Sequence, residues 1–353
     1  MPEPTTSASA AAPVRAVNSL VALLRRAGLL DWFLLGLIGV VVLAYFIPEA
    51  GSKSSPIPWF IITKGGVALI FFFYGLRLSL DKLKAGLRNW RLHVVVQVIT
   101  FLVFPLLALA VRPLFEGAKG PQLWQSIFFL CTLPSTVSTS VVMVSIARGN
   151  LPAAIFNASI SSLLGIVLTP LWTSFFLHTA ADGGHLWGMA LSLTWQVILP
   201  VVAGVLLNRR FGAFAEQHKS TLRLSDQVVI LLIVFTAFCE SFAEGIFRSY
   251  GARDIVLLGM GMVALYLLIF GVVWGLSWLL GFSREDRITA LFCGSKKSLV
   301  HGSVMASLLF PAAAGTGLIL LPLMLYHALQ IILASMMAQR MGRLPLTGRA
   351  ELQ

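Results

Sequence analysis

The sequence predicts an all-α, polytopic membrane protein with ten transmembrane helices, and three observations support that class. Of the 353 residues, 58% are hydrophobic and 11% are charged, whereas an ordinary soluble domain carries about 25% charged residues. The apolar residues form long continuous runs, and about 20 such residues span a bilayer as a helix. A β-barrel would instead alternate apolar and polar residues in segments of about ten. Composition therefore excludes a typical soluble enzyme.

The apolar runs predict the helices in chain order. They cover residues 31–48, 57–76, 92–111, 122–147, 151–178, 186–208, 226–245, 254–280, 287–309 and 314–339. Residues 1–27 are expected to form a disordered and amphipathic cytoplasmic N-terminus, and residues 343–353 a cytoplasmic tail. The short apolar part of the N-terminus precedes Arg25 and Arg26, which is the reverse of a secretory signal peptide.

The basic residues predict the orientation. Lys and Arg number 26 against 14 Asp and Glu, for a net charge of +12. With the N-terminus inside, the outer loops hold only Lys53, Arg112, Lys119, Arg248 and Arg253. Lys64, Lys296 and Lys297 lie within apolar runs, and all the other basic residues fall on the cytoplasmic side. The positive-inside rule thus predicts an inner (plasma) membrane protein with both termini in the cytoplasm. The lipid bilayer is then the expected partner, without nucleic acid, and the oligomeric state stays open.

Five spans followed by five predict two repeats of opposite orientation, at residues 28–180 and 185–342. Aligning Cys131 with Cys293 also aligns Met143 with Met305. Both aligned stretches are the most polar parts of their halves, and both lie inside a span. This pattern favours a secondary transporter built from an inverted repeat.

The polar stretches predict broken helices and an anion site. Pro134 removes a hydrogen-bond donor and clashes with the preceding turn. Breaks would leave half-helix N-termini near residues 135–138 and 297–300, and such ends attract anions. Hydroxyl groups nearby can bind a substrate or a cation. The candidates at the first break are Ser135, Thr136, Ser138, Thr139 and Ser140.

Lys296 and Lys297 are the strongest signal in the second polar stretch. A lysine at the bilayer centre costs several kcal/mol or more, and Lys296 lies about 13 Å along a helix from Arg287. Snorkelling to the inner boundary is one interpretation. The other is that at least one lysine lines a cavity, as counter-ion to an anionic substrate or in place of a coupling cation. Ser295, Ser298 and His301 are candidates beside them.

Two amides, Gln97 and Asn157, lie inside other spans, and each fits either a ligand role or a helix–helix hydrogen bond. No Asp or Glu lies in the middle of a span. Neither a metal site nor a cofactor is expected, and coupling to Na⁺ or H⁺ stays open. Gly165, Gly259 and Gly261 are interpreted as close helix contacts.

Several motifs resemble one transporter family. They are Phe71-Phe72-Phe73-Tyr74-Gly75-Leu76-Arg77-Leu78-Ser79-Leu80, Leu133-Pro134-Ser135-Thr136-Val137-Ser138-Thr139-Ser140, Ala147-Arg148-Gly149-Asn150, Phe292-Cys293-Gly294-Ser295-Lys296-Lys297-Ser298 and Leu321-Pro322-Leu323. Over about residues 28–342 the chain resembles the bile acid:sodium symporter (SBF-like) superfamily. Within it, the resemblance is to the branch of solute carrier family ten member seven and its bacterial relatives.

The resemblance implies a fold and a substrate class. The fold has ten helices in two inverted five-helix repeats, a panel domain and a core domain, with broken helices 4 and 9 that cross near the midplane. The substrates are organic anions, and the bile-acid carriers are coupled to sodium.

The resemblance also implies sodium ligands at positions that differ here. The matching residues are Ser140, Val141, Ala154, Ala158, Phe292 and Lys296, with Gln97 as the nearest candidate for a ligand in the third span. Of the first five, only Ser140 keeps a side-chain oxygen. A lysine ammonium could replace the missing cation, so the usual sodium sites are expected to be lost.

The predicted function is therefore secondary transport of a small organic anion by alternating access. The alternatives are a conventional sodium-coupled symporter and a regulatory membrane protein that does not transport. An enzyme with a Lys297–Ser298 dyad is not expected, because neighbours on a helix do not face one another.

Overall fold

The computed structural model describes residues 32–78, 89–115, 120–177, 186–310 and 315–343, without the side chains of residue 138 and residues 186–197. The predicted cytoplasmic N-terminus over residues 1–27 and the tail beyond residue 343 lie outside the described residues. Every regular element in the described part of the chain is a helix. Seven helices there are long and apolar enough to cross a membrane: Trp59–Arg77, Trp90–Ala110, Leu151–Phe176, Ile198–Gln217, Lys219–Ala243, Ala252–Leu279 and Thr316–Arg343. The protein is an integral, polytopic membrane protein.

The helices follow the predicted order. The first half contains α2 (Trp32–Phe46), α3 (Pro48–Gly51), α4 (Trp59–Arg77), α6 (Trp90–Val98), the π-helical turn η1 (Ile99–Val103), α7 (Phe104–Ala110), the short η2 (Arg112–Leu114), α8 (Gly120–Thr132), α9 (Ser138–Ile146) and α10 (Leu151–Phe176). The second half contains α11 (Leu186–Gln217), α12 (Lys219–Ala243), the short η3 (Ile246–Ser249), α13 (Ala252–Leu279), α14 (Arg284–Gly294), α15 (Leu299–Leu309) and α16 (Thr316–Arg343). Helix covers most of each predicted range.

Two helix ends differ from the apolar pattern. α11 continues to Gln217 rather than ending at residue 208, and α12 begins at Lys219 rather than at residue 226. Arg209 and Arg210 are exposed on the added turns. Hydropathy marks where a helix suits lipid, but backbone hydrogen bonding can continue a helix into water.

Helical structure stops inside two of the predicted spans. The first break, residues 133–137, separates α8 from α9, and the second, residues 295–298, separates α14 from α15. Pro134 explains the first break. At the second, the Ser298 hydroxyl accepts a hydrogen bond from the amide of His301 at 3.3 Å, which begins α15 with an N-cap.

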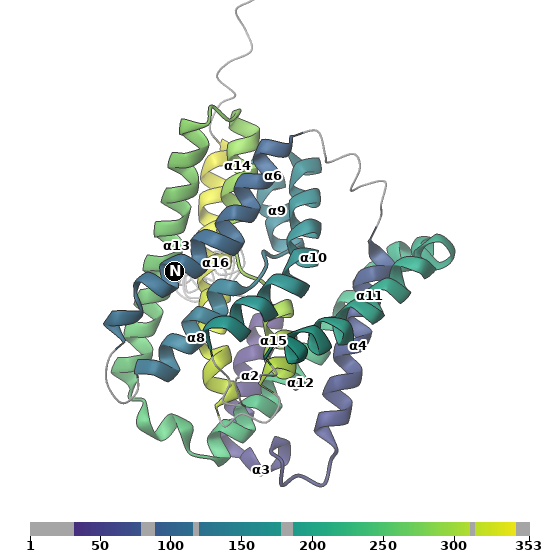
Figure 1. Cartoon of the computed structure of the whole chain (residues 1–353), viewed down its shortest axis with the longest axis vertical. Coiled ribbons are helices and arrows are strands. Elements are labelled where there is room, and N and C mark those ends of the chain that lie inside the picture. The colour runs from purple at the N-terminus through teal and green to yellow at the C-terminus, as the bar shows by residue number, and fades with distance from the viewer. Residues whose placement is uncertain (1–31, 79–88, 116–119, 178–185, 311–314, 344–353) are drawn as a thin grey trace, which may run out of the picture.

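The packing separates two groups of helices. α4 and α11 lie together at the right of Figure 1, whereas α6, α9, α13, α14 and α16 lie toward the left and centre. A side chain at Gly75 would meet the carbonyl of Val201, so α4 and α11 touch backbone to backbone. Arg77 at the end of α4 forms an ion pair with Asp226 of α12, with 2.7 Å between Nη2 and Oδ2.

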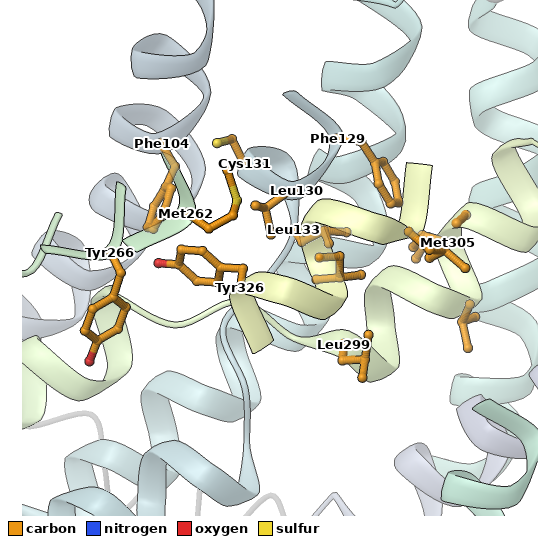
Figure 2. Close-up of a cluster of buried hydrophobic side chains, with 14 of the residues drawn as sticks. Phe104, Phe129, Leu130, Cys131, Leu133, Met262, Tyr266, Leu299, Met305 and Tyr326 are labelled. Atoms are coloured by element: carbon orange, nitrogen blue, oxygen red, sulfur yellow. The ribbon is translucent and has the colours of Figure 1, made fainter. Parts of the chain in front are cut away.

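Large buried side chains fill the space around the breaks. Figure 2 shows Phe104, Cys131, Met262 and Tyr326 grouped together, with Leu133 beside them. Phe104 and Tyr326 are fully buried, and their ring centroids lie 6.4 Å apart. Lipid is as apolar as these side chains, so tight packing rather than transfer from water stabilises the core.

The expectations for three glycines are only partly met. A Cβ atom at Gly165 would lie 2.6 Å from Cγ of Pro134, so this glycine makes the predicted close contact. The interpretation was wrong for Gly259 and Gly261, where such an atom would have no neighbour within 4 Å. Both lie on α13, and composition alone does not reveal which face of a helix meets another helix.

Candidate functional site

The two breaks contact each other. The amide of Ser298 donates to the carbonyl of Pro134 at 2.9 Å. The hydroxyl of Ser135 donates to the carbonyl of Cys293 at 2.6 Å. Broken backbone away from water must find partners inside the protein, and here each break supplies partners to the other.

Helix α10 supports the first break along one face. The Ser161 hydroxyl accepts from the amide of Ser135 at 2.9 Å, and the Thr169 hydroxyl donates to the carbonyl of Thr132 at 2.9 Å. Gly165 lies between them and admits Pro134. Sequence reasoning missed Ser161 and Thr169. Their spacing of four residues on either side of Gly165 was the available signal.

Lys297 is held like a coordinated cation. Its Nζ donates to the carbonyls of Thr100 at 2.8 Å, Cys131 at 2.7 Å and Leu133 at 2.8 Å. It also lies 4.0 Å from the ring centroid of Phe104. The side chain is fully buried, and all three ammonium hydrogens are used.

The carbonyl groups that bind Lys297 are available to it because they lie where the helical hydrogen-bond pattern is interrupted. Cys131 lies in the last turn of α8 and Leu133 follows it, where carbonyls lack helical partners and carry partial negative charge. Thr100 lies in the π-helical turn η1. We refer to these three oxygens as the carbonyl cage.

Helix α16 binds the second break. The Gln330 side chain accepts from the amide of Lys297 at 2.9 Å and donates to its carbonyl at 2.8 Å. The Tyr326 hydroxyl donates to the carbonyl of Ser295 at 2.7 Å. Sequence reasoning missed both residues, although Gln330 stands out as an amide within an apolar run.

Lys296 has fewer partners than Lys297. Its side chain is also fully buried, but within the described residues its Nζ makes one hydrogen bond, to the carbonyl of Thr139 at 3.0 Å. The ring centroid of Phe292 lies 5.9 Å away. Ion pairs of the described residues lie elsewhere, among them Lys53 with Glu240 and Glu244, Arg77 with Asp226, and Lys219 with Glu216.

Hydroxyl groups cluster at the start of α9, beside the carbonyl that binds Lys296. Thr136 Oγ1 lies 2.7 Å from Thr139 Oγ1 and 2.8 Å from Ser140 Oγ. Ser138 begins α9, and its side chain lies outside the described part of the structure. The predicted residues Thr136, Thr139, Ser140 and Lys296 are thereby brought together.

The other predicted side chains at the second break have two kinds of partner: some bind the backbone of their own segment, and His301 contacts helix α4. Ser295 donates to the carbonyl of Leu291 at 2.6 Å, within its own chain segment. The Ser298 hydroxyl lies 3.0 Å from Nδ1 of His301. The His301 ring meets Tyr74 of α4 edge to face, with centroids 5.8 Å apart, so His301 lies between α15 and α4.

The two amides bind each other. Gln97 Nε2 donates to both the carbonyl and the side-chain oxygen of Asn157, each at 3.3 Å. This geometry favours a helix–helix hydrogen bond between α6 and α10. Gln97 Oε1 is buried and has no partner, so it can still accept from a ligand.

The positions implied to hold sodium offer few side-chain oxygens. Ala154, Ala158 and Phe292 are fully buried. The Phe292 ring packs against Phe270, with centroids 6.1 Å apart. Over the described residues, no group of three His, Cys, Asp or Glu side chains could hold a metal ion.

A cavity of about 350 Å³ lies away from the breaks, where α3, α4, α12, α15 and α16 meet. Its lining includes Lys53, Trp59, Thr63, Glu240 and Ser307. None of the predicted site residues lines it. Helix α15 begins at the second break and leads to this cavity: Ser307, near the C-terminal end of α15, is one of the lining residues.

Comparison with known proteins points to one transporter family. Residues 31–343 match the SBF-like CPA transporter family. The chain is 42% identical to an uncharacterized protein of Pseudomonas aeruginosa over 89% of its own length and 93% of that protein. It is 36% identical to YfeH of Escherichia coli K12, which carries the name of a symporter, with coverage of 89% and 94%. It is 30% identical to sodium/bile acid cotransporter 7-B of Xenopus laevis, with coverage of 92% and 95%.

Proposed function

Since this chain belongs to the SBF-like CPA transporter family and is a transporter of the bile acid:sodium symporter kind, we propose that it carries a small organic anion by alternating access, without sodium. The carbonyl cage around Lys297 is the observation that carries this proposal. Three neutral oxygens within 2.8 Å of a buried ammonium are a cation site whose cation is part of the chain. A tethered cation cannot cross the membrane, so it stabilises the breaks without drawing on an ion gradient.

The charges and donors around the breaks suit an anion. Lys296 and Lys297 are both buried there, and no acidic residue of the described chain pairs with either. A further cation would be repelled by the Lys297 ammonium, and the repulsion between charges is strong where water is scarce. The first turns of α9 and α15 present amides that lack helical acceptors.

The predicted site residues then take different roles. Lys296 binds the anion together with the hydroxyls of Thr136, Thr139 and Ser140, and His301 contacts it from the α4 side. Ser298 and the free oxygen of Gln97 complete the binding surface, and Ser138 stays a candidate from the sequence alone. Ser135, Ser295 and Asn157 support the backbone around it, because their side chains bind carbonyl groups.

Transport requires one group of helices to move against the other. We assign α2, α4, α11 and α12 to the panel and the remaining long helices to the core. The two repeats cover residues 28–180 and 185–342, the broken helices cross near the midplane, and both termini are cytoplasmic. The close contact between α4 and α11 and the Arg77–Asp226 ion pair support a rigid panel. The 350 Å³ cavity touches both groups and is the outer approach to the site.

Thermal stability in detergent tests the proposal. Purified protein is heated with taurocholate, pyruvate or succinate, in sodium chloride or in choline chloride. We expect at least one anion to raise the melting temperature equally in both salts and to lose this effect in Lys296→Gln. Lys64→Gln is the matched control, because Lys64 is exposed on α4. A stabilisation that requires sodium and survives Lys296→Gln would overturn the proposal in favour of a conventional sodium-coupled symporter.

A further inference from the structure

The two adjacent lysines differ in how well the protein compensates a charge. Lys297 uses all three ammonium hydrogens on carbonyl oxygens and also contacts an aromatic face. Lys296 is equally buried but has one carbonyl partner among the described residues. A buried charge without adequate partners is costly, and such a group neutralises instead. The protein therefore compensates a permanent charge on Lys297 but not on Lys296.

The elements packed around Lys296 supply no negative charge to balance it. Helices α9 and α10 contain no titratable side chain. On α14, Glu285 and Asp286 lie in the first turn, with Asp286 about 12 Å of helix before Gly294, and Asp286 accepts from Asn89 and Asn150. On α13, Asp254 lies in the first turn, roughly 24 Å of helix away from Phe270, which packs against Phe292. The remaining titratable or charged groups on the surrounding elements are Arg91 and His93 on α6, Arg253 and Tyr266 on α13, Arg284, Arg287 and Cys293 on α14, Lys297 in the break, His301 on α15, and Tyr326, His327, Arg340 and Arg343 on α16.

The positive charge of Lys297 also disfavours a positive charge on the neighbouring Lys296. It is the next residue in the chain, and its ammonium donates to the three oxygens of the carbonyl cage. Repulsion between like charges grows as the surroundings become less polar. An anion bound beside Thr139 would compensate a positive charge on Lys296.

We propose that Lys296 is a neutral amine in the empty carrier and takes up a proton together with the anionic substrate, so that the protein is a proton–anion symporter. This inference rests on the proposed function and adds the coupling ion to it. The Lys296 amine lone pair binds one proton from water as one negative charge of the substrate enters, and no bond of the substrate breaks. Release of the anion on the other side discharges the same proton. One proton then accompanies each negative charge that Lys296 balances.

The dependence of stability on pH tests the charge state without any ligand. The melting temperature is measured from pH 6 to pH 9 for the wild type, Lys296→Gln and Lys296→Met. An unfolded lysine is protonated throughout this range. If the folded lysine is neutral, the wild type gains stability relative to either variant as the pH rises. The folding equilibrium constant changes about tenfold per pH unit wherever folding releases one proton.

Parallel curves for the wild type and both variants would overturn the inference. Lys296→Arg serves as a second comparison, because arginine keeps its charge; it should fold less stably and follow the slope of the Gln and Met variants. Lys64→Gln should follow the wild type. These measurements contain no anion, so the proposed function can hold when this inference fails.

Proton movement provides the second measurement. The carrier is reconstituted into vesicles that contain a pH-sensitive dye, and taurocholate, a sulfonate that stays ionised, is added outside in sodium-free buffer. We expect the interior to acidify, and Lys296→Gln to abolish the acidification. Transport of labelled taurocholate without acidification would overturn the coupling and leave anion transport intact. If taurocholate is not carried, the pH dependence of stability decides the inference alone.

Discussion

Gln330 holds Lys297 by its backbone while the side chain of Lys297 reaches away to the carbonyl cage. The Gln330 amide group accepts from the Lys297 amide at 2.9 Å and donates to the Lys297 carbonyl at 2.8 Å. It thus replaces the helical partners that the break removes on both sides of one residue. A helix from the end of the chain thereby fixes the point from which the buried ammonium extends.

Replacing Gln330 by Leu should strongly destabilise the protein. Two buried backbone groups would lose their partners, at a cost of about 1–3 kcal/mol each. The measurement is the melting temperature in detergent. Gln339→Leu on the same helix is the control, because Gln339 bonds to Ser335 one turn away. Equal small decreases for the two variants would show that the Gln330 clamp contributes little.

Replacing Lys297 by Ala should empty the carbonyl cage and create a dependence on added cations. We expect a lower melting temperature that sodium, ammonium or methylammonium ions partly restore, because the three carbonyl oxygens can coordinate a small cation. Lys296→Ala should show no such restoration. Failure of every cation to stabilise Lys297→Ala would count against the cage as a cation site.

Substituting Gly165 should be costly, whereas substituting Gly259 should be neutral. A Cβ atom at Gly165 would lie 2.6 Å from Cγ of Pro134, but at Gly259 it would have no neighbour within 4 Å. Overpacking typically costs about 1–3 kcal/mol, so Gly165→Ala should lower the melting temperature clearly. Gly259→Ala should leave it unchanged or raise it through better helix propensity. The opposite order would mean that α10 does not pack against the first break as described.

The Lys53–Glu240 pair should stabilise the rim of the 350 Å³ cavity up to strongly alkaline pH. The distance between Lys53 Nζ and Glu240 Oε1 is 2.8 Å, and the hydrogen bond to Glu240 raises the pKa of Lys53 above its usual value. A raised lysine pKa means that the stabilisation is present below the unfolded pKa, about 10.4, and is lost as the pH rises through the folded value.

The comparison of wild type with Glu240→Gln measures this contribution. Lys53 is largely exposed, so the difference should be small, about 0–1 kcal/mol. It should stay constant from pH 7 to pH 9 and shrink above about pH 10.5. A difference that already disappears by pH 8 would contradict the assignment to Lys53. Glu216→Gln, which removes an exposed pair with Lys219, should change stability less.

Local features of the sequence predicted much of the fold. The apolar runs located the helices, because a long apolar segment has few other stable conformations in a bilayer. Pro134 located the first break, because proline cannot continue the hydrogen-bond ladder. The family resemblance, based on motifs around these same residues, agrees with the match over residues 31–343.

The roles of the two lysines depended on the tertiary structure. Both are buried, and adjacency in the sequence makes them equivalent in composition and hydropathy. Which ammonium reaches the carbonyls of Thr100, Cys131 and Leu133 depends on how η1, α8 and the second break meet. Gln330, Ser161 and Tyr326 were missed for the same reason, since each acts on a backbone group far away in the chain.

Composition, hydropathy and the two polar stretches thus determined that this chain is a helical membrane protein with two breaks, because those properties act along the chain. Only the tertiary structure decided that Lys297 is satisfied by the protein and that Lys296 is not. A hydrogen bond depends on distance and direction in space, and neighbouring residues on a chain can reach different partners.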